Sequence, residues 1–422
     1  MKILQIVHHF PQTAGAGVEN YTRQICDALS QTESVSVITR GSHLFSGPYG
    51  ALFPLTGFPY PVMAFFRHPR DRSSPEQSYW DPGLEPAFRE FITSWKPDIV
   101  HFQHAIDLSM SLVHTARSAC RTVLFTLHDY WTQCPRIIRI DNRGAICLRD
   151  SEPAACQRCM TILYKAPRLF MSGPSFFRIR NRRMMEELQA CQAILCPSQT
   201  VARTATSAGI TPNRLLHWPF GIDHSNLPPR KATDMLPSDP IRFGYTGTFS
   251  HHKGLPVLLN AFSRLPDDVK NRSELHVFGG SPDSSTMSRW INRFRRRCSS
   301  SRIRFRGLYS RTDLVPIQNE LDVIVVPSTW LENRPLTILE AFASGNPVIG
   351  SCLGGIQELL ESSGAGWLFQ PGDTETLIKI ITSIVRRPEE IIEKRQRIPS
   401  VPNIDDECRN LLELYRRYLS VQ

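Results

Sequence analysis

Two glutamates eight positions apart are the residues whose types and spacing best suit chemistry. Both lie in the segment WLENRPLTILE, in which Pro335 fits the first turn of a helix, so Glu332 falls in the loop before that helix and Glu340 inside it. A helix start offers backbone N–H groups and a partial positive charge to a phosphate. One carboxylate accepts two hydroxyl groups at once, so the pair suits the sugar and ribose ends of a nucleotide sugar. For either glutamate alone, a capping acid or a solvated helix residue is the simpler explanation.

Two glycine-bearing turns add further anion-binding signals. The segment GTFSHHKG, from Gly247 to Gly254, places a glycine, Lys253 and a helix start directly after an apolar strand. It is not a P-loop, because the pattern GxxxxGK[ST] is absent. Gly354 and Gly355, in GGIQE, stand at another strand-to-helix turn. Each signal is weak alone, since a lysine before a helix is usually only solvated.

The first half of the chain carries a glycine turn and a histidine at strand ends. Gly15 and Gly17 follow the first strand, but Asn20 stands where a dinucleotide fingerprint needs a small residue, so NAD binding is disfavoured. A turn that lets the backbone approach a diphosphate is the alternative. The strand at residues 122–127 ends in HDYW, where His128 could donate to a sugar hydroxyl or a phosphate. A lone histidine is more often structural.

Short β-branched runs alternate with longer helical patterns, which favours parallel sheets covered on both faces. Ligands bind beyond the carboxyl ends of such strands. A proline-rich seam at residues 228–240 separates two similar halves. We therefore expect an α/β protein with two Rossmann-like doubly wound domains, residues 1–227 and 228–400, and a helix in 401–422 that packs back on the first domain. Residues 44–83, rich in proline and phenylalanine, predict a loop or flap. The expected strands are 2–7, 35–39, 98–102, 122–127, 193–196, 241–246, 274–278, 322–326 and 347–350.

Four cysteines lie in one insertion, residues 134–159, directly after HDYW. The spacing C-x12-C-x8-C-x2-C favours a zinc knuckle over a set of loop thiols or disulfides. Four thiolates leave no open coordination position, so such a zinc would be structural. The proposed ligands are Cys134, Cys147, Cys156 and Cys159.

Composition limits the function classes. The chain has 422 residues, of which 41% are hydrophobic and 21% charged, as in ordinary globular proteins of two or three domains. The net charge of +10 favours anionic partners. No apolar run suits a spanning helix, and the N-terminus resembles a first strand more than a secretory signal. We expect a cytoplasmic protein. Arginine-rich segments at 176–185 and 293–297 fit an anionic inner-membrane surface as well as a solvated helix face, and no nucleic-acid-binding module is present.

Together these motifs resemble the family-4 retaining glycosyltransferases (glycosyl transferases group 1), which have the two-domain GT-B fold with a cleft between the domains. The resemblance covers nearly the whole chain and is strongest from Trp330 to Gly372. PFGID at residues 219–223 resembles the family's link between domains. The cysteine-bearing insertion after the HD motif resembles that of one subgroup.

The resemblance implies transfer of a sugar from a nucleotide-diphosphate sugar to a glycan or lipid-linked acceptor, with retention, in cell-surface polysaccharide synthesis. It implies no cofactor for catalysis. Catalytic roles fall on Glu332 beside the reacting sugar, His128, and Lys253 at the diphosphate, while Glu340 would bind the ribose. Thr248 stands where many members have a basic residue. The implied donor-binding residues are Gly15, Gly17, Gly247, Lys253, Asn333, Arg334, Pro335, Leu336, Thr337 and Glu340.

Other functions fit the same pattern less well. A sugar-nucleotide epimerase or a phosphorylase can use this fold, and a non-catalytic scaffold could bind membrane through its arginine-rich segments. The glutamate pair together with GGIQE favours transfer. No second carboxylate is marked as a covalent nucleophile, so a front-face displacement is favoured over a double displacement.

Overall fold

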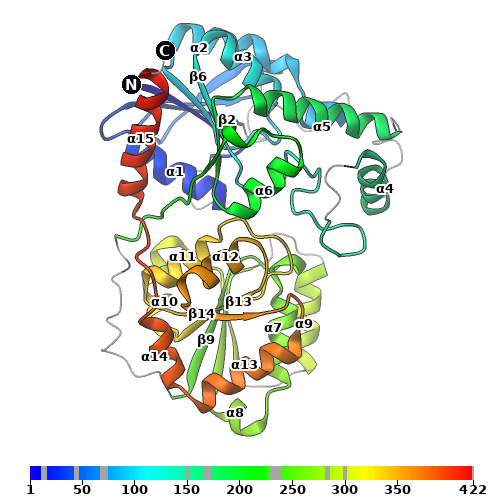
Figure 1. Cartoon of the computed structure of the whole chain (residues 1–422), viewed down its shortest axis with the longest axis vertical. Coiled ribbons are helices and arrows are strands. Elements are labelled where there is room, and N and C mark those ends of the chain that lie inside the picture. The colour runs from blue at the N-terminus through cyan, green and yellow to red at the C-terminus, as the bar shows by residue number, and fades with distance from the viewer. Residues whose placement is uncertain are drawn as a thin grey trace. The chain divides into compact units, whose positions relative to one another are not determined.

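The protein forms two compact units in a computed structural model, Met1–Phe220 with Ile404–Gln422, and Gly221–Asn403 (Figure 1). The first break therefore follows residue 220 rather than 227. The residues near this break and those near Asn403 form one paired segment, since Ile222 bridges to Asn403 in parallel. The structure describes residues 1–10, 17–41, 47–66, 75–147, 152–164, 173–225, 227, 239–280, 286–297 and 302–420, and residues 228–238 of the expected seam lie outside it.

The described part of the first unit holds an eight-stranded sheet in the order β3-β4-β2-β1-β5-β6-β7-β8. All neighbours are parallel except β3 and β4. The central strands are almost wholly buried, as short apolar runs covered on both faces should be. The strands are β1 (Lys2–Ile6), β2 (Ser34–Arg40), β3 (Leu52–Leu55), β4 (Val62–Phe65), β5 (Ile99–Phe102), β6 (Thr122–Thr126), β7 (Ala193–Cys196) and β8 (Leu215–His217).

The expectation of a loop or flap over residues 44–83 is wrong in its central part. β3 and β4 form an antiparallel pair there, and β4 extends the sheet beside β2. Pro54 within β3 cannot donate a ladder hydrogen bond, and it is tolerated because β3 is the edge strand. The prolines that obscured these strands in the sequence are thus compatible with a sheet edge.

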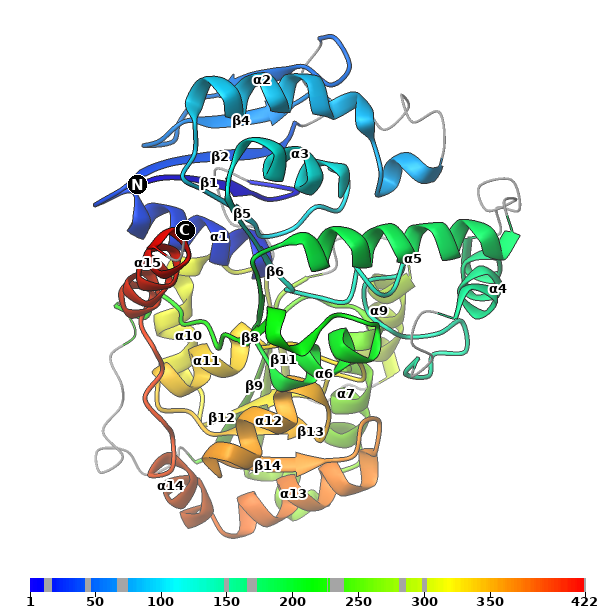
Figure 2. The same cartoon turned by 45° about the horizontal axis from the view of Figure 1, so that its top comes forward.

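The last helix, α15 (Ile404–Ser420), belongs to the first unit and lies along α1 (Gly17–Leu29) (Figure 2). Its apolar residues recur every three or four positions, so Cys408, Leu411 and Tyr415 are buried on one face. The other helices of the unit are α2 (Glu85–Trp95), α3 (Ser111–Ala119), α4 (Pro153–Tyr164), α5 (Gly173–Ala190) and α6 (Gln199–Ser207).

The second unit holds a parallel sheet of six strands within the described residues, in the order β11-β10-β9-β12-β13-β14. The strands are β9 (Ile241–Thr246), β10 (Ser273–Phe278), β11 (Ile303–Gly307), β12 (Val323–Val326), β13 (Val348–Ser351) and β14 (Gly366–Phe369). The helices are α7 (Leu255–Ser263), α8 (Asp267–Asn271), α9 (Thr286–Arg297), α10 (Leu314–Glu320), α11 (Leu336–Ala343), α12 (Gly354–Ser363), α13 (Thr374–Arg386) and α14 (Glu389–Arg395).

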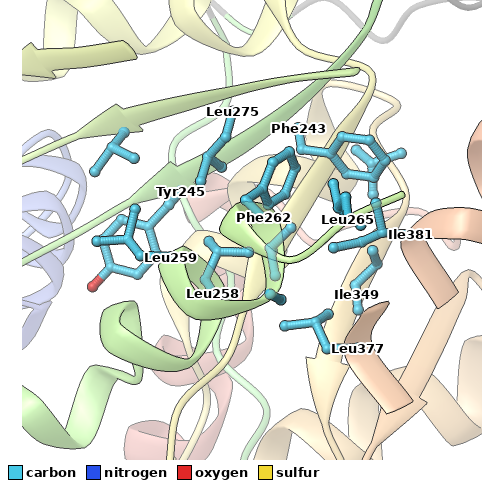
Figure 3. Packing of buried hydrophobic residues seen from close by; sticks show 14 of the residues in the cluster. Phe243, Tyr245, Leu258, Leu259, Phe262, Leu265, Leu275, Ile349, Leu377 and Ile381 are labelled. Atoms are coloured by element: carbon cyan, nitrogen blue, oxygen red, sulfur yellow. The ribbon is translucent and has the colours of Figure 1, made fainter. Parts of the chain in front are cut away.

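The core of the second unit lies between this sheet and two helices on one face. Phe243 and Leu275 from the sheet meet Phe262 of α7, with Leu377 and Ile381 of α13 beside them (Figure 3). Full burial of side chains this large contributes about 1.5–3 kcal/mol each to folding. The packing anchors β9 and the start of α7, and therefore the loop between them. Among the described residues, no helix is both long and apolar enough to span a bilayer.

Candidate active site

Glu332 lies in the loop that leaves β12 and enters α11. Its side chain is 7% exposed, and its Oε1 accepts hydrogen bonds from Lys253 Nζ at 2.7 Å and from Ser328 Oγ at 2.8 Å. Lys253 comes from the turn between β9 and α7, so two neighbouring strands deliver the pair from the same edge of the sheet. The structure thus brings together two of the residues singled out from the sequence.

The Lys253–Glu332 pair is charged. Burial by itself raises the pKa of Glu332, but the charge of Lys253 and the hydrogen bonds from Lys253 and Ser328 outweigh it, so the pKa lies below its usual value. The ammonium group also lies 5.2 Å from the ring centre of Trp330, at the distance of a cation–π contact. Sequence reasoning gave no role to Ser328 or Trp330, although both stand in the same loop as Glu332.

Two glycines hold this loop by close backbone approach. A Cβ on Gly355 would lie 1.5 Å from the Asn333 carbonyl oxygen, and the Gly355 N–H donates to the Glu332 carbonyl at 2.7 Å. Gly254, with φ of 73°, would place a Cβ 1.7 Å from the Pro327 carbonyl oxygen. The GGIQE turn therefore supports the Glu332 loop, a structural role that its reading as an anion site did not include.

The predicted donor residues from Asn333 to Thr337 lie at the start of α11. Pro335 is the N-cap, Leu336 begins the helix, and Asn333 is 5% exposed just before it. Arg334 and Thr337 are half-buried. The free backbone N–H groups of this first turn lie at the positive end of the helix dipole, where an anion binds favourably.

Glu340 lies one helix turn further along α11 and is half-buried. Burial raises the pKa of Tyr309, and the Glu340 carboxylate raises it further. Burial likewise raises the pKa of Tyr245, with contributions from Glu332 and Tyr309. The two carboxylates therefore lie within electrostatic reach of tyrosines near the carboxyl ends of β9 and β11, and ligands of parallel α/β sheets bind at this kind of edge.

The glycine loop after β9 packs tightly but supplies one cation. A Cβ on Gly279 would lie 1.8 Å from the Gly247 carbonyl oxygen, so the turns after β9 and β10 touch through glycine backbones. Thr248 is exposed, and its carbonyl accepts from the Tyr245 hydroxyl at 2.8 Å. Besides Lys253, His252 lies in this turn, with its ring edge-on to Trp330 at 5.4 Å.

In the first unit, His128 follows β6 and lies among buried polar groups. Its Nε2 is 2.8 Å from Gln103 Oε1. Burial lowers the pKa of His128 to about 3, so the ring is neutral at physiological pH. Gly17 is the first residue of α1, whereas Gly15 lies outside the described residues.

Two carboxylate–imidazole pairs lie in the same unit and were not predicted from the sequence. His8 Nε2 lies 3.2 Å from Glu19 Oε1, and His104 Nε2 lies 3.0 Å from Asp129 Oδ2. The rings of His8 and His104 are 4.7 Å apart. His8 Nδ1 and Glu19 Oε2 are buried and have no hydrogen-bond partner among the described residues. The available signal was Glu19, the acid in GAGVE, which stands two residues after Gly17.

The four insertion cysteines line one cavity of about 340 Å³, together with Arg136. Among the described residues no three histidine, cysteine or acidic side chains are grouped as metal ligands, and the cysteines are free thiols. Burial, followed by the charges of the other insertion cysteines, raises the pKa of Cys156 to about 12. Arg180 of α5 is 3% exposed and lies within electrostatic reach of Cys134 and Cys156.

The arginine-rich segment 176–185 lies in α5 and is only partly exposed. Phe177 and Arg180 are buried, and Arg183 pairs with a glutamate of the first unit. Arg178 and Arg182 remain exposed. The outward face of α5 therefore carries two of the four arginines.

The fold and this site define a class of proteins. The chain has two doubly wound α/β units. At the strand ends of the second lie two carboxylates and a helix N-terminus suited to binding a phosphate. These features are typical of glycosyltransferases of the GT-B fold. Residues 15–226 match the family model described as Glycosyltransferase Family 4, and residues 231–399 match Glycosyl transferases group 1. The chain belongs to this glycosyltransferase family.

Relatives and solved structures agree with this assignment. The sulfoquinovosyl transferase SQD2 of Arabidopsis thaliana is 26% identical over 50% of this chain and 41% of its own length. The amylovoran biosynthesis glycosyltransferase AmsK of Erwinia amylovora is 24% identical over 47% of this chain and 46% of its own. The matches thus span under half of either relative. Anabaena HepE, solved with UDP-glucose, aligns with a TM-score of 0.68 at 15% identity over 99% of this chain and 100% of that one, which supports the fold.

Proposed function

We propose that this protein is a retaining glycosyltransferase that moves a sugar from a nucleotide-diphosphate sugar to a glycan or lipid-linked acceptor. The observation that carries the proposal is the ion pair between buried Glu332, just before α11, and partly exposed Lys253, with Glu340 eight residues after Glu332. The likeness of the fold to a protein solved with UDP-glucose supports a nucleotide-sugar donor.

Each residue near α11 has a part in the proposed reaction. Breaking the bond between sugar and phosphate builds negative charge on the leaving diphosphate. Lys253 and the first N–H groups of α11 lie on preorganised elements and would absorb this charge. Glu332 would accept hydrogen bonds from the donor sugar, and Glu340 would accept them from the ribose.

The proposed chemistry is a front-face displacement. The acceptor oxygen bonds to the anomeric carbon on the face that the diphosphate leaves, and the proton of the acceptor hydroxyl passes to the departing diphosphate. Because the bond forms on the face where the old one breaks, the anomeric configuration is retained. Lys253 is already held at Glu332, so it needs little reorganisation to meet the diphosphate.

We propose that the acceptor is a growing cell-surface polysaccharide or its lipid carrier, in keeping with the name of the amylovoran relative. We place the enzyme in the cytoplasm at the inner face of an anionic membrane. Arg293, Arg295 and Arg296 of α9 are exposed and supply positive charge, while the side chain of Arg297 lies outside the described residues. Attraction to anionic lipid is worth about 1 kcal/mol for each such residue near the surface.

A structural zinc ion in the cysteine insertion completes the proposal. Four cysteines share one cavity, although binding would have to draw their sulfur atoms together. Zinc with four thiolates carries a net charge of −2, and buried Arg180 would supply a counter-charge at Cys134 and Cys156. Metal analysis of purified protein should find one zinc per chain, reduced in Cys156→Ser but not in Cys352→Ser. A zinc-free, folded wild type would contradict this.

A thermal-shift screen of UDP-, GDP- and ADP-sugars tests the donor proposal. A ligand present at 100 times its dissociation constant stabilises by about 2.7 kcal/mol, so one nucleotide series should raise the melting temperature clearly. Proton NMR of the product then gives the configuration at the new bond. The absence of any shift, or an inverted product, would contradict the proposal. Nucleotide-sugar isomerisation without an acceptor would favour an epimerase instead.

A further inference from the structure

Hydrogen bonds join the C-terminal helix to His128 through side chains buried in the first unit. His128 Nε2 donates to Gln103 Oε1 at 2.8 Å, because an amide oxygen only accepts. Gln103 Nε2 donates to Gln5 Oε1 at 3.0 Å and to His101 Nδ1 at 3.3 Å. Gln5 Nε2 in turn donates to the Tyr415 hydroxyl at 3.2 Å. From His128 to Tyr415, each residue therefore donates a hydrogen bond to the next, and the last acceptor belongs to α15.

The Tyr415 hydroxyl sets the direction of these hydrogen bonds. Its oxygen accepts from Gln5. His101 Nδ1, 2.7 Å from that oxygen, faces the Gln103 amide donor and therefore carries no proton, so the tyrosine hydroxyl donates to it. With Nδ1 accepting, His101 carries its proton on Nε2 and donates to Thr126 Oγ1 at 2.8 Å. Gln5, Gln103, His101 and Tyr415 are each 0% exposed, so water offers no substitute partner.

We propose that Tyr415 is a positioning residue that fixes the tautomer of His128, with the proton on Nε2 and Nδ1 left as an acceptor. Among the described residues, His128 Nδ1 makes no hydrogen bond. A neutral ring that offers only an acceptor can bind a group that donates, so it selects a sugar hydroxyl over a phosphate oxygen. The sugar part rests on the proposed function, whereas the tautomer does not.

Removing the Tyr415 hydroxyl should allow His128 to change its tautomer. In Tyr415→Phe, Gln5 Nε2 and His101 Nδ1 both lose a partner, and the two glutamine amides can then turn over. Gln103 would offer either its oxygen or its nitrogen to His128, and the ring would populate both tautomers. A purely structural tyrosine would affect stability without affecting the protonated nitrogen of a histidine in another element.

Nitrogen NMR of the full-length protein with labelled histidine measures the tautomers directly. Signals are assigned with His128→Gln and His101→Gln. We expect His128 and His101 to be protonated on Nε2 in the wild type, and His128 to become a mixture in Tyr415→Phe. Tyr418→Phe is the matched control, since Tyr418 is a half-buried residue of the same helix with no hydrogen bond to a described residue, and it should keep the wild-type pattern.

A second variant covers a failure of Tyr415→Phe to fold. Gln103→Met removes the direct partner of His128 and should also give a tautomer mixture. Protonation of His128 on Nδ1 in the wild type, or an unchanged tautomer in either folded variant, would overturn the proposal.

Donor affinity tests the sugar part separately. Once the screen has identified a binding nucleotide sugar, its dissociation constant should rise about two- to tenfold in Tyr415→Phe, as expected for one weakened hydrogen bond. The affinity for the matching nucleoside diphosphate alone should stay the same. A changed tautomer with unchanged sugar affinity would overturn the hydroxyl assignment. If no nucleotide sugar binds the wild type, the proposed function fails while the tautomer result still stands.

Discussion

Both units place polar side chains at or near the carboxyl ends of parallel strands, but two of them in the second unit differ in charge from two in the first. In the second unit, Lys253 keeps the pKa of Glu332 low, so both members of the pair are charged. In the first, burial lowers the pKa of His101 and His128 to about 3, so both rings are neutral. The second unit therefore presents a charged pair, whereas His101 and His128 make directed hydrogen bonds as neutral rings. The first unit keeps its charge on other groups, the carboxylates of Glu19 and Asp129, whose pKa values lie below their usual range.

The largest effect expected from this difference follows loss of the carboxylate charge. Glu332→Gln keeps the shape of the side chain but removes the charge beside the reacting sugar, so turnover should fall about 10²–10³-fold. Nucleotide release from the donor found in the screen measures it. The exposed Glu361→Gln on α12 is the control and should retain full activity. Equal activity of the two variants would show that Glu332 has no part in the reaction.

Removal of the cation should next affect stability. Lys253→Met leaves the Glu332 carboxylate buried without its charged partner, which should lower the free energy of unfolding by about 2 kcal/mol, less than for a fully buried pair because Lys253 is partly exposed. Urea denaturation measures it. The double variant Lys253→Met/Glu332→Gln should recover part of the loss. A double variant as unstable as Lys253→Met alone would argue against the ion pair as the cause.

The two units should lose stability at different pH values as the solution is acidified. Histidine has a pKa of about 6.5 when unfolded, against about 3 for buried His101 and His128. Between these values the unfolded chain binds more protons. The stabilisation from the neutral rings is therefore complete above pH 6.5. Towards pH 3 it falls by about 1.4 kcal/mol for each pH unit and each ring.

Melting temperatures from pH 7 to 4 test this window. His101→Gln should flatten the decline below pH 6.5, while Glu332→Gln should change it only near and below the unfolded pKa of glutamate, about 4.3. Lowering of the pKa of Glu332 means that its contribution is lost only as pH falls through its folded value. An unchanged slope in His101→Gln would mean that the ring is not held neutral by burial.

The smallest expected effect is on donor affinity, from adding a basic residue at Thr248 in the glycine loop after β9. Thr248 is exposed, so Thr248→Arg should add a screened contact to the diphosphate worth about 0.2–1 kcal/mol, or roughly a one-and-a-half- to fivefold gain in donor affinity. Calorimetry at low and high salt measures it, and the gain should shrink with salt. Thr248→Gln is the uncharged control. A gain that salt leaves unchanged would show that charge is not its source.

Much of the fold was accessible from the sequence because strands buried on both faces have a strong local pattern. The expected strand at 241–246 matches β9, and that at 193–196 matches β7. β3 and β4 were missed because their stability comes from pairing at a sheet edge, where proline is tolerated. Local pattern could not show which distant partner they would meet.

The site was predictable in its parts rather than in its pairings. The spacing of Glu332 and Glu340 and the lysine at 253 were visible as types and positions. Their direct ion pair joins residues 79 positions apart, and only the order of β9 and β12 in the sheet brings it about. The hydrogen bond from Gln5 to Tyr415 spans 410 positions, and no local signal indicates it.

A crystal structure of the whole protein with the nucleoside diphosphate that stabilises it most would show directly whether Lys253 and α11 bind the diphosphate. We expect the diphosphate within hydrogen-bond distance of Lys253 Nζ and the first N–H groups of α11, and the ribose hydroxyls within hydrogen-bond distance of Glu340. A nucleotide bound with its phosphates away from both Lys253 and α11 would contradict this expectation.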